Sequence, residues 1–214
     1  MKKIIFVFLA ACVVLAVGCR WVGIRGNGHI KTEDRTISTF TEIDASGAFE
    51  IEWQGGSPAL RITTDENLLS YVESDVSGDT LHLRTHDQIW PTHGIKVSIS
   101  SPTRAAARIR GAVRLTVKQL TGPTFALEAS GASRVSLDGN IDGLLADMTG
   151  ASKLEASGLQ TKTAEISTTG AGNAEVAVAE TLKVAITGAG KVTYSGNPTI
   201  EKHITGAGSV RRKD

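Results

Sequence analysis

Apolar and polar residues alternate along the second half of the chain around a recurring Gly-Ala corner. The positions two, four and six residues before each corner glycine, and four after it, are mostly apolar, whereas the positions between them are mostly polar or charged. A period of two is typical of strands that bury one face, so each repeat is predicted to hold two short strands joined by a turn at the corner. The corner glycines are Gly111, Gly131, Gly150, Gly170, Gly188 and Gly206, at gaps of 20, 19, 20, 18 and 18 residues.

Repeats of 18–20 residues predict one coil each of a parallel β-helix. They are too short for a helical-hairpin repeat of about 34 residues. Equivalent residues of neighbouring coils would lie about 4.7–4.9 Å apart, and ladders of like residues would form a shared core. The sequence therefore predicts an all-β solenoid, with glycine allowing the tight corners.

The first half of the chain is less regular but has the same alternation. Residues 40–53 alternate around a Gly-Ala turn, and residues 60–63, 81–84 and 95–100 are predicted strands. Residues 67–72 are predicted to form a short helical turn. No linker is evident, so residues 37–214 are predicted to be one domain.

The N-terminus has the pattern of an export signal. Two lysines precede an apolar run at residues 4–17, which is too short to span a bilayer comfortably and is typical of a signal peptide. The run ends at Cys19 in a sequence that resembles the bacterial lipobox. We predict a lipoprotein signal peptide at residues 1–18, lipid attachment (palmitate) at Cys19 and a polar tether at residues 19–36. An ordinary secretory signal is the alternative.

Composition fits these predictions and narrows the range of partners. Hydrophobic residues make up 41% of the 214 residues, but aromatic residues only 5%, as expected for a narrow core filled by small and β-branched side chains. Lys and Arg number 23 against 22 Asp and Glu, a formal charge of +1. A dedicated nucleic-acid-binding domain would have a pI above about 9, so no nucleic-acid partner is predicted.

The candidate binding surface is a row of side chains three residues after each corner glycine. Stacking of the coils would align them into a basic stripe able to bind a polyanion such as an acidic polysaccharide or lipopolysaccharide. Two residues further on, Glu155 and Glu175 can neutralise Lys153 and its neighbours. Thr116 and Ser136 stand at the same position after Arg114 and Arg134, so these two arginines are expected to be uncompensated. A charge ladder that only prevents misregister of the coils is the alternative interpretation. The stripe comprises Arg114, Arg134, Lys153 and Lys191, with Asn173 between the two lysines.

An enzymatic site is the competing hypothesis. Glu128 and Asp147 would lie on adjacent coils, near enough for the carboxylate pair of a glycosidase, although two solvated surface acids are the simpler interpretation. His82, His86 and His93 match no metal-ligand spacing. We therefore predict no catalytic residue, no metal and no cofactor. The charged residues 210–214 are predicted to protect the open end of the solenoid, with a basic recognition tail as the alternative.

Several segments together resemble the head GIN domain family, described as "putative auto-transporter adhesin". They are residues 40–43, 46–51, 65–69 and 78–83 and the serial Gly-Ala repeats, covering roughly residues 37–212. The resemblance implies a right-handed parallel β-helix, pectin-lyase-like in shape, without a recognised catalytic site, and a role in adhesion.

The expected function is thus a lipid-anchored β-helix of the cell envelope that recognises a surface glycan or protein. Lipid on Cys19 would attach the protein to the membrane, which is expected to be the outer membrane. A polysaccharide-degrading enzyme and a purely structural envelope protein are the alternatives.

Overall fold

The structure is a computed structural model and describes residues 23–213. The predicted signal peptide, Cys19 and Asp214 lie outside the described residues. The strands are β1 Ile24–Arg25, β2 Ile30–Arg35, β3 Glu42–Gly47, β4 Phe49–Gly55, β5 Ala59–Asp65, β6 Val72–Ser77, β7 Thr80–Thr85, β8 Ile89–Trp90, β9 Ile95–Ser101, β10 Ala106–Gly111, β11 Arg114–Gly131, β12 Arg134–Gly150, β13 Lys153–Gly170, β14 Asn173–Gly188, β15 Lys191–Ser195, β16 Thr199–Gly206 and β17 Ser209–Arg212. A 3₁₀ helix, η1, spans Glu66–Tyr71.

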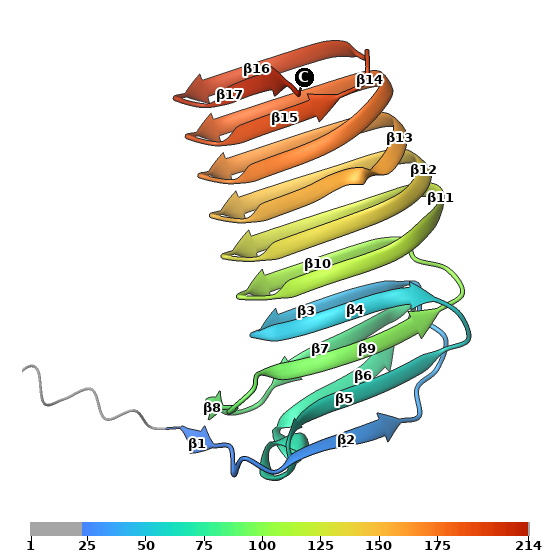
Figure 1. Cartoon of the computed structure of the whole chain (residues 1–214), viewed down its shortest axis with the longest axis vertical. Coiled ribbons are helices and arrows are strands. Elements are labelled where there is room, and N and C mark those ends of the chain that lie inside the picture. The colour runs from blue at the N-terminus through green and yellow to red at the C-terminus, as the bar shows by residue number, and fades with distance from the viewer. Residues whose placement is uncertain (1–22, 214) are drawn as a thin grey trace, which may run out of the picture.

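Successive coils stack in parallel and in register, which confirms the predicted β-solenoid (Figure 1). Strand β11 pairs with β12, β12 with β13 and β13 with β14, and each corner glycine lies beside the next. Gly150 shows why the corner requires glycine. Its φ is +90°, and a Cβ placed there would lie 2.7 Å from the carbonyl oxygen of Gly131 on the preceding coil.

The coils differ from the prediction of two short strands each. Strands β11 to β14 continue through the bend opposite the glycine corner, so one long strand runs round most of each coil. The register shifts at this bend, between Val117 and Leu120 in the β11–β12 pair. Because the extra residues of the longer coils bulge out here, the glycine corners stay aligned although the repeats vary in length.

The inward columns of side chains form one hydrophobic core. Its largest rings lie at the N-terminal end, where Trp53 is 5.9 Å from Phe40 and 6.3 Å from Phe125, measured between ring centroids. The Trp53 indole Nε1 donates to Ser101 Oγ at 2.9 Å. Later coils are filled by smaller buried side chains, among them Ala146, Leu154, Ile166, Val184 and Val192.

The N-terminal end of the solenoid is covered by additional structure. Strand β2 pairs antiparallel with β5, β5 pairs antiparallel with β9, and β6 pairs antiparallel with β7. The predicted strands at residues 60–63, 81–84 and 95–100, and the helical turn at 67–72, are confirmed within a residue or two by β5, β7, β9 and η1.

The tether predicted for residues 19–36 is wrong for residues 24–35, which contain β1 and β2. Strand β2 is an edge strand with largely exposed side chains, so it has no apolar alternation that would reveal it. Arg35, the last residue of β2, donates hydrogen bonds to the carbonyl oxygens of Leu69 and Val72 at 2.8 and 2.6 Å and so holds the end of this strand in place.

The C-terminal end of the solenoid is open (Figure 1). The side chains of β16 are mostly exposed, and Ile204, in an inward column, is 36% exposed. Strand β17 pairs with β15 and ends the last coil. Within residues 23–213, no helix is long and apolar enough to cross a bilayer.

Candidate functional site

The predicted basic stripe is a continuous ladder on the strands that follow the glycine corners. Strand pairing places Arg114 beside Arg134, Arg134 beside Lys153, Lys153 beside Asn173, and Asn173 beside Lys191. These side chains alternate with inward ones such as Leu115 and Val135, which are buried, so the cationic groups face solvent.

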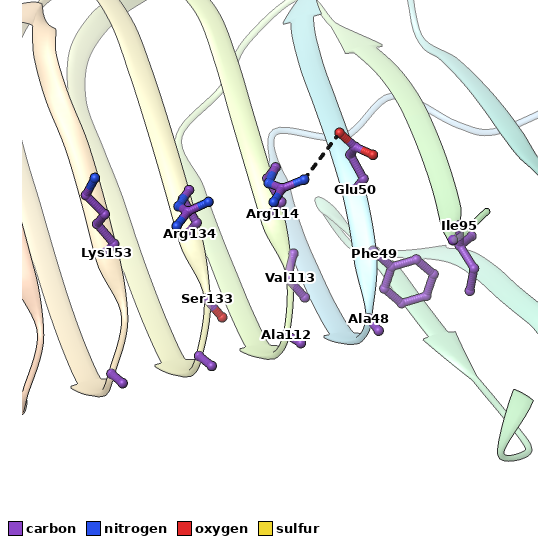
Figure 2. Close-up of a pocket in the computed structure, with 13 residues that line it drawn as sticks. Ala48, Phe49, Glu50, Ile95, Ala112, Val113, Arg114, Ser133, Arg134 and Lys153 are labelled. Carbon is purple, nitrogen blue, oxygen red and sulfur yellow. Dashed lines mark ion pairs between the residues drawn. The ribbon is translucent and has the colours of Figure 1, made fainter. Parts of the chain in front are cut away.

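A groove of about 420 Å³ runs beside the stripe along the glycine corners. The exposed methyl groups of Ala112, Ala132 and Ala151, one per coil, line its corner side. Figure 2 shows Arg114, Arg134 and Lys153 following one another across three neighbouring strands, with Ala112 at the corner below Arg114. Corner and stripe together form an amphipathic surface with a regular repeat along the solenoid axis.

Two of the cations in the groove have acidic neighbours. Lys153 Nζ lies 2.5 Å from Glu155 Oε1, as the sequence predicted, and this hydrogen bond lowers the pKa of Glu155. Arg114 Nη1 lies 3.7 Å from Glu50 Oε1 (Figure 2). Among residues 23–213, no carboxylate forms an ion pair with Arg134 or Lys191.

The partners of Glu50 and Glu175 differ from those predicted. Arg114 was expected to be uncompensated, but β4 pairs with β11 and sets Glu50 beside it. Glu50 lies three residues after Gly47, as Arg114 does after Gly111, so the corner spacing contains a signal for this pairing. The signal is obscured because an irregular segment separates β4 from β11 and breaks the regular period. Glu175 instead accepts a hydrogen bond from Lys213 Nζ at 3.0 Å, and among residues 23–213 it forms no ion pair with a cation of the stripe.

The carboxylate pair considered for catalysis lies on the strands that precede the corners. Glu128 and Asp147 are neighbours in register. Arg108 binds Glu128 in bidentate fashion, with Nε to Oε2 at 2.6 Å and Nη2 to Oε1 at 3.0 Å. These hydrogen bonds lower the pKa of Glu128, which is therefore ionised near neutral pH and has no proton to give as a general acid.

The three histidines of the first half do not converge. His82 Nδ1 lies 4.0 Å from Asp44, His86 Nδ1 lies 3.5 Å from Glu73, and His93 Nδ1 is 2.9 Å from Thr92 Oγ1. Within residues 23–213, no three His, Cys, Asp or Glu side chains are grouped as metal ligands would be.

Two buried charged residues that the sequence pattern did not reveal hold the scaffold together. Asp65 accepts hydrogen bonds from the backbone of Gly28 and Thr92 and from the Thr92 hydroxyl at 2.7–2.8 Å. Burial opposes ionisation, but these bonds outweigh it and lower the pKa of Asp65. Arg104 donates to the carbonyl oxygens of Lys118 and Gln119 at the opposite bend, and burial lowers its pKa.

Solved structures share this fold at low sequence identity. The crystal structure of a "putative adhesin" from Bacteroides fragilis matches with a TM-score of 0.75 and 22% identity over 89% of this chain and 100% of that one. A "putative lipid binding protein" from Parabacteroides distasonis gives 0.58 and 22% over 89% and 99%. A "putative adhesin" from Parabacteroides merdae gives 0.59 and 19% over 90% and 99%. No curated protein matches the sequence.

The family model for "Putative auto-transporter adhesin, head GIN domain" matches residues 39–198, close to the extent of the motifs noted in the sequence. The matched region runs from just before β3 to just before β16 and so includes the groove and the whole stripe. The chain belongs to the head GIN domain family.

Proposed function

We propose that this protein is a binding module of the cell envelope that holds an anionic surface glycan on its basic stripe. The observation that carries the proposal is the in-register ladder of Arg114, Arg134, Lys153 and, after Asn173, Lys191. The first three of these cations line a groove of about 420 Å³. The description of the family as an adhesin supports a role in binding rather than in catalysis.

Binding on such a surface depends on several contacts acting together. An exposed ion pair contributes about 0.2–1 kcal/mol, so one cation holds an anion only weakly. The coils form one hydrogen-bonded sheet, so the cations are held on a rigid support and a linear polyanion can contact several at once. Because the contacts are exposed, salt should weaken them.

The proposed location is the outer membrane, with the protein anchored by lipid on Cys19. The support is the apolar run at residues 4–17 and the lipobox-like sequence that follows it. Multiple acyl chains would give firm attachment at about 0.8 kcal/mol per buried CH₂. Labelling of cells with radioactive palmitate should mark the wild type and leave Cys19→Ser unlabelled. Label retained by Cys19→Ser would overturn the anchor.

Charge reversal in the groove tests the binding proposal. Arg114→Glu with Arg134→Glu should lose at least about tenfold in retention on an array of acidic glycans and on whole cells, because two attractive contacts become repulsive. Arg84→Glu on β7 with Lys202→Glu on β16 makes the same change in net charge away from the groove and should bind like the wild type. Equal binding by the two double variants would contradict the proposal.

Vesicles of anionic lipid provide a second arm of this experiment, since a structural neighbour is described as a "putative lipid binding protein". Stripe-dependent binding to vesicles without binding to any acidic glycan would replace the glycan with a lipid surface.

A further inference from the structure

We infer that the ligand of the groove is a polysaccharide with an acidic group on every sugar, lying along the solenoid axis with one sugar per coil. This inference rests on the proposed function and specifies its ligand.

The spacing of the cations is the first argument. Arg114, Arg134 and Lys153 are paired residue to residue, and the register shifts fall after them, at the opposite bend. Parallel pairing therefore fixes their backbones about 4.7–4.9 Å apart. This spacing is comparable to the length of one pyranose ring in a linear glycan. A chain with an acidic group on every sugar can present one anion to each of these cations, whereas a chain with one on every second sugar can match Arg114 and Lys153 but leaves Arg134 unmatched.

The corner side of the groove is the second argument. Ala112, Ala132 and Ala151 repeat with the same spacing as the cations and expose their methyl groups. The buried Ser133 hydroxyl between corner and stripe donates to the carbonyl oxygens of Gly111 and Ser130 at 3.2 and 3.1 Å. The corner is thus an apolar shelf, suited to the C–H face of a sugar ring whose carboxylate points to the stripe.

The three consecutive cations of the stripe, Arg114, Arg134 and Lys153, have an uncharged or acidic residue at each end. Glu50 precedes Arg114 in the ladder and would repel an acidic group. Asn173 follows Lys153 and offers an uncharged amide before the next cation, Lys191. Three consecutive cations between a carboxylate and an amide match three consecutive acidic sugars.

Two oligosaccharides of equal length, each long enough to cover the ladder from Arg114 to Lys191, test the spacing. Oligogalacturonate has a carboxylate on every sugar, and hyaluronate has one on every second sugar. By titration calorimetry, the wild type should bind oligogalacturonate about twofold to fivefold more tightly, because it can also pair with Arg134. Both probes can reach Arg114, Lys153 and Lys191, which lie two coils apart.

Two gain-of-function variants sharpen the test. Asn173→Lys fills the gap and should extend the ladder to five consecutive cations, and Glu50→Gln removes the competing carboxylate. Each should increase affinity for oligogalacturonate by about twofold to fivefold. Asn140→Lys adds the same charge as Asn173→Lys at an exposed position at the opposite bend and should leave affinity unchanged.

The failure of this inference can be distinguished from failure of the proposed function. Equal affinity for the two probes, lost in Arg114→Glu with Arg134→Glu, would overturn the one-sugar-per-coil inference and leave the proposed function standing. An equal gain from Asn140→Lys and Asn173→Lys would also overturn it, since net charge alone would then explain binding. Binding of neither probe, with no stripe-dependent binding to any acidic glycan, would overturn both.

Discussion

Asp65 joins three segments at the N-terminal end of the solenoid. Its carboxylate is buried and receives hydrogen bonds from Gly28 and Thr92, which belong to loops on either side of it in sequence. A carboxylate in this position accepts all of these bonds without a proton. Its ionised form is therefore part of the folded structure.

Asp65→Asn should destabilise the protein by about 2 kcal/mol at pH 7, because the amide NH₂ would face the donors of Thr92 or Gly28. The pKa of Asp65 is lower in the folded chain than in the unfolded chain. Its contribution to stability is therefore present above the unfolded pKa of about 3.9 and is lost as pH falls through the folded pKa. The difference between wild type and variant, measured by urea unfolding, should shrink as the buffer is taken below pH 4.

Asp79→Asn is the matched control because Asp79 lies in an exposed turn. It should change stability little at either pH. A pH-independent difference between Asp65→Asn and the wild type would show that the charge of Asp65 is not what stabilises the fold.

Glycine at the corners is required by contact between coils as well as by backbone conformation. Gly150→Ala should cost more than about 2 kcal/mol, since φ is +90° and the added Cβ would meet the main chain of Gly131. Gly78→Ala should cost about 1 kcal/mol, because φ is +59° and no atom lies within 4 Å of the added Cβ. Thermal unfolding of both variants measures the difference. Equal costs would mean that conformation alone sets the need for glycine.

The spatial neighbours of some residues can be predicted from the sequence, whereas those of others cannot. The sequence predicts that Arg114 and Arg134 are neighbours, because each lies three residues after a corner glycine. Glu50 was missed because it joins the ladder through a strand pair that skips the irregular segment between β4 and β11. Asp65 was missed because a buried carboxylate follows no periodicity, and its donors come from loops.

At the level of strands, β16 is the exposed edge of the open end. Lys202 of β16 pairs with Val184, which belongs to an inward column and is buried. A charged side chain in an inward position at an edge disfavours the addition of another strand. The charged C-terminus predicted to protect this end therefore has a counterpart within β16 itself.

Lys202→Val should increase self-association relative to the wild type, because it extends the apolar column to the edge of the sheet. Analytical ultracentrifugation over a range of concentrations measures the effect. His203→Val places the same side chain on the outward face of the same strand and should have less effect. Equal association of the two variants would assign the effect to added hydrophobicity rather than to the inward position.

Strands were predicted well where repetition made them visible. The alternation around each glycine predicted β10 to β17, while the bend that joins the two halves of each coil has no fixed motif and was not located. Strand β2 was missed because both of its faces are largely exposed and its partner β5 is distant in sequence. Pairing between non-repeated segments is decided by tertiary packing, which periodicity does not report.

The whole molecule is a solenoid with one covered end and one open end. The N-terminal end has the bulky rings and the antiparallel strands, and the later coils repeat a small-residue core. This arrangement turns a sequence period into a spatial period on the outer surface, with one Ala and one polar side chain per coil beside the corner. The proposed function depends on that outer period rather than on any single residue.

An NMR titration with oligogalacturonate tests most directly whether the stripe is the binding surface. The largest amide shifts are expected at Ala132, Ser133 and Arg134 and at their neighbours one coil to either side, and these shifts should diminish as salt is added. Shifts confined to the strands before the corners, around Glu128 and Asp147, with the stripe unchanged, would contradict the account.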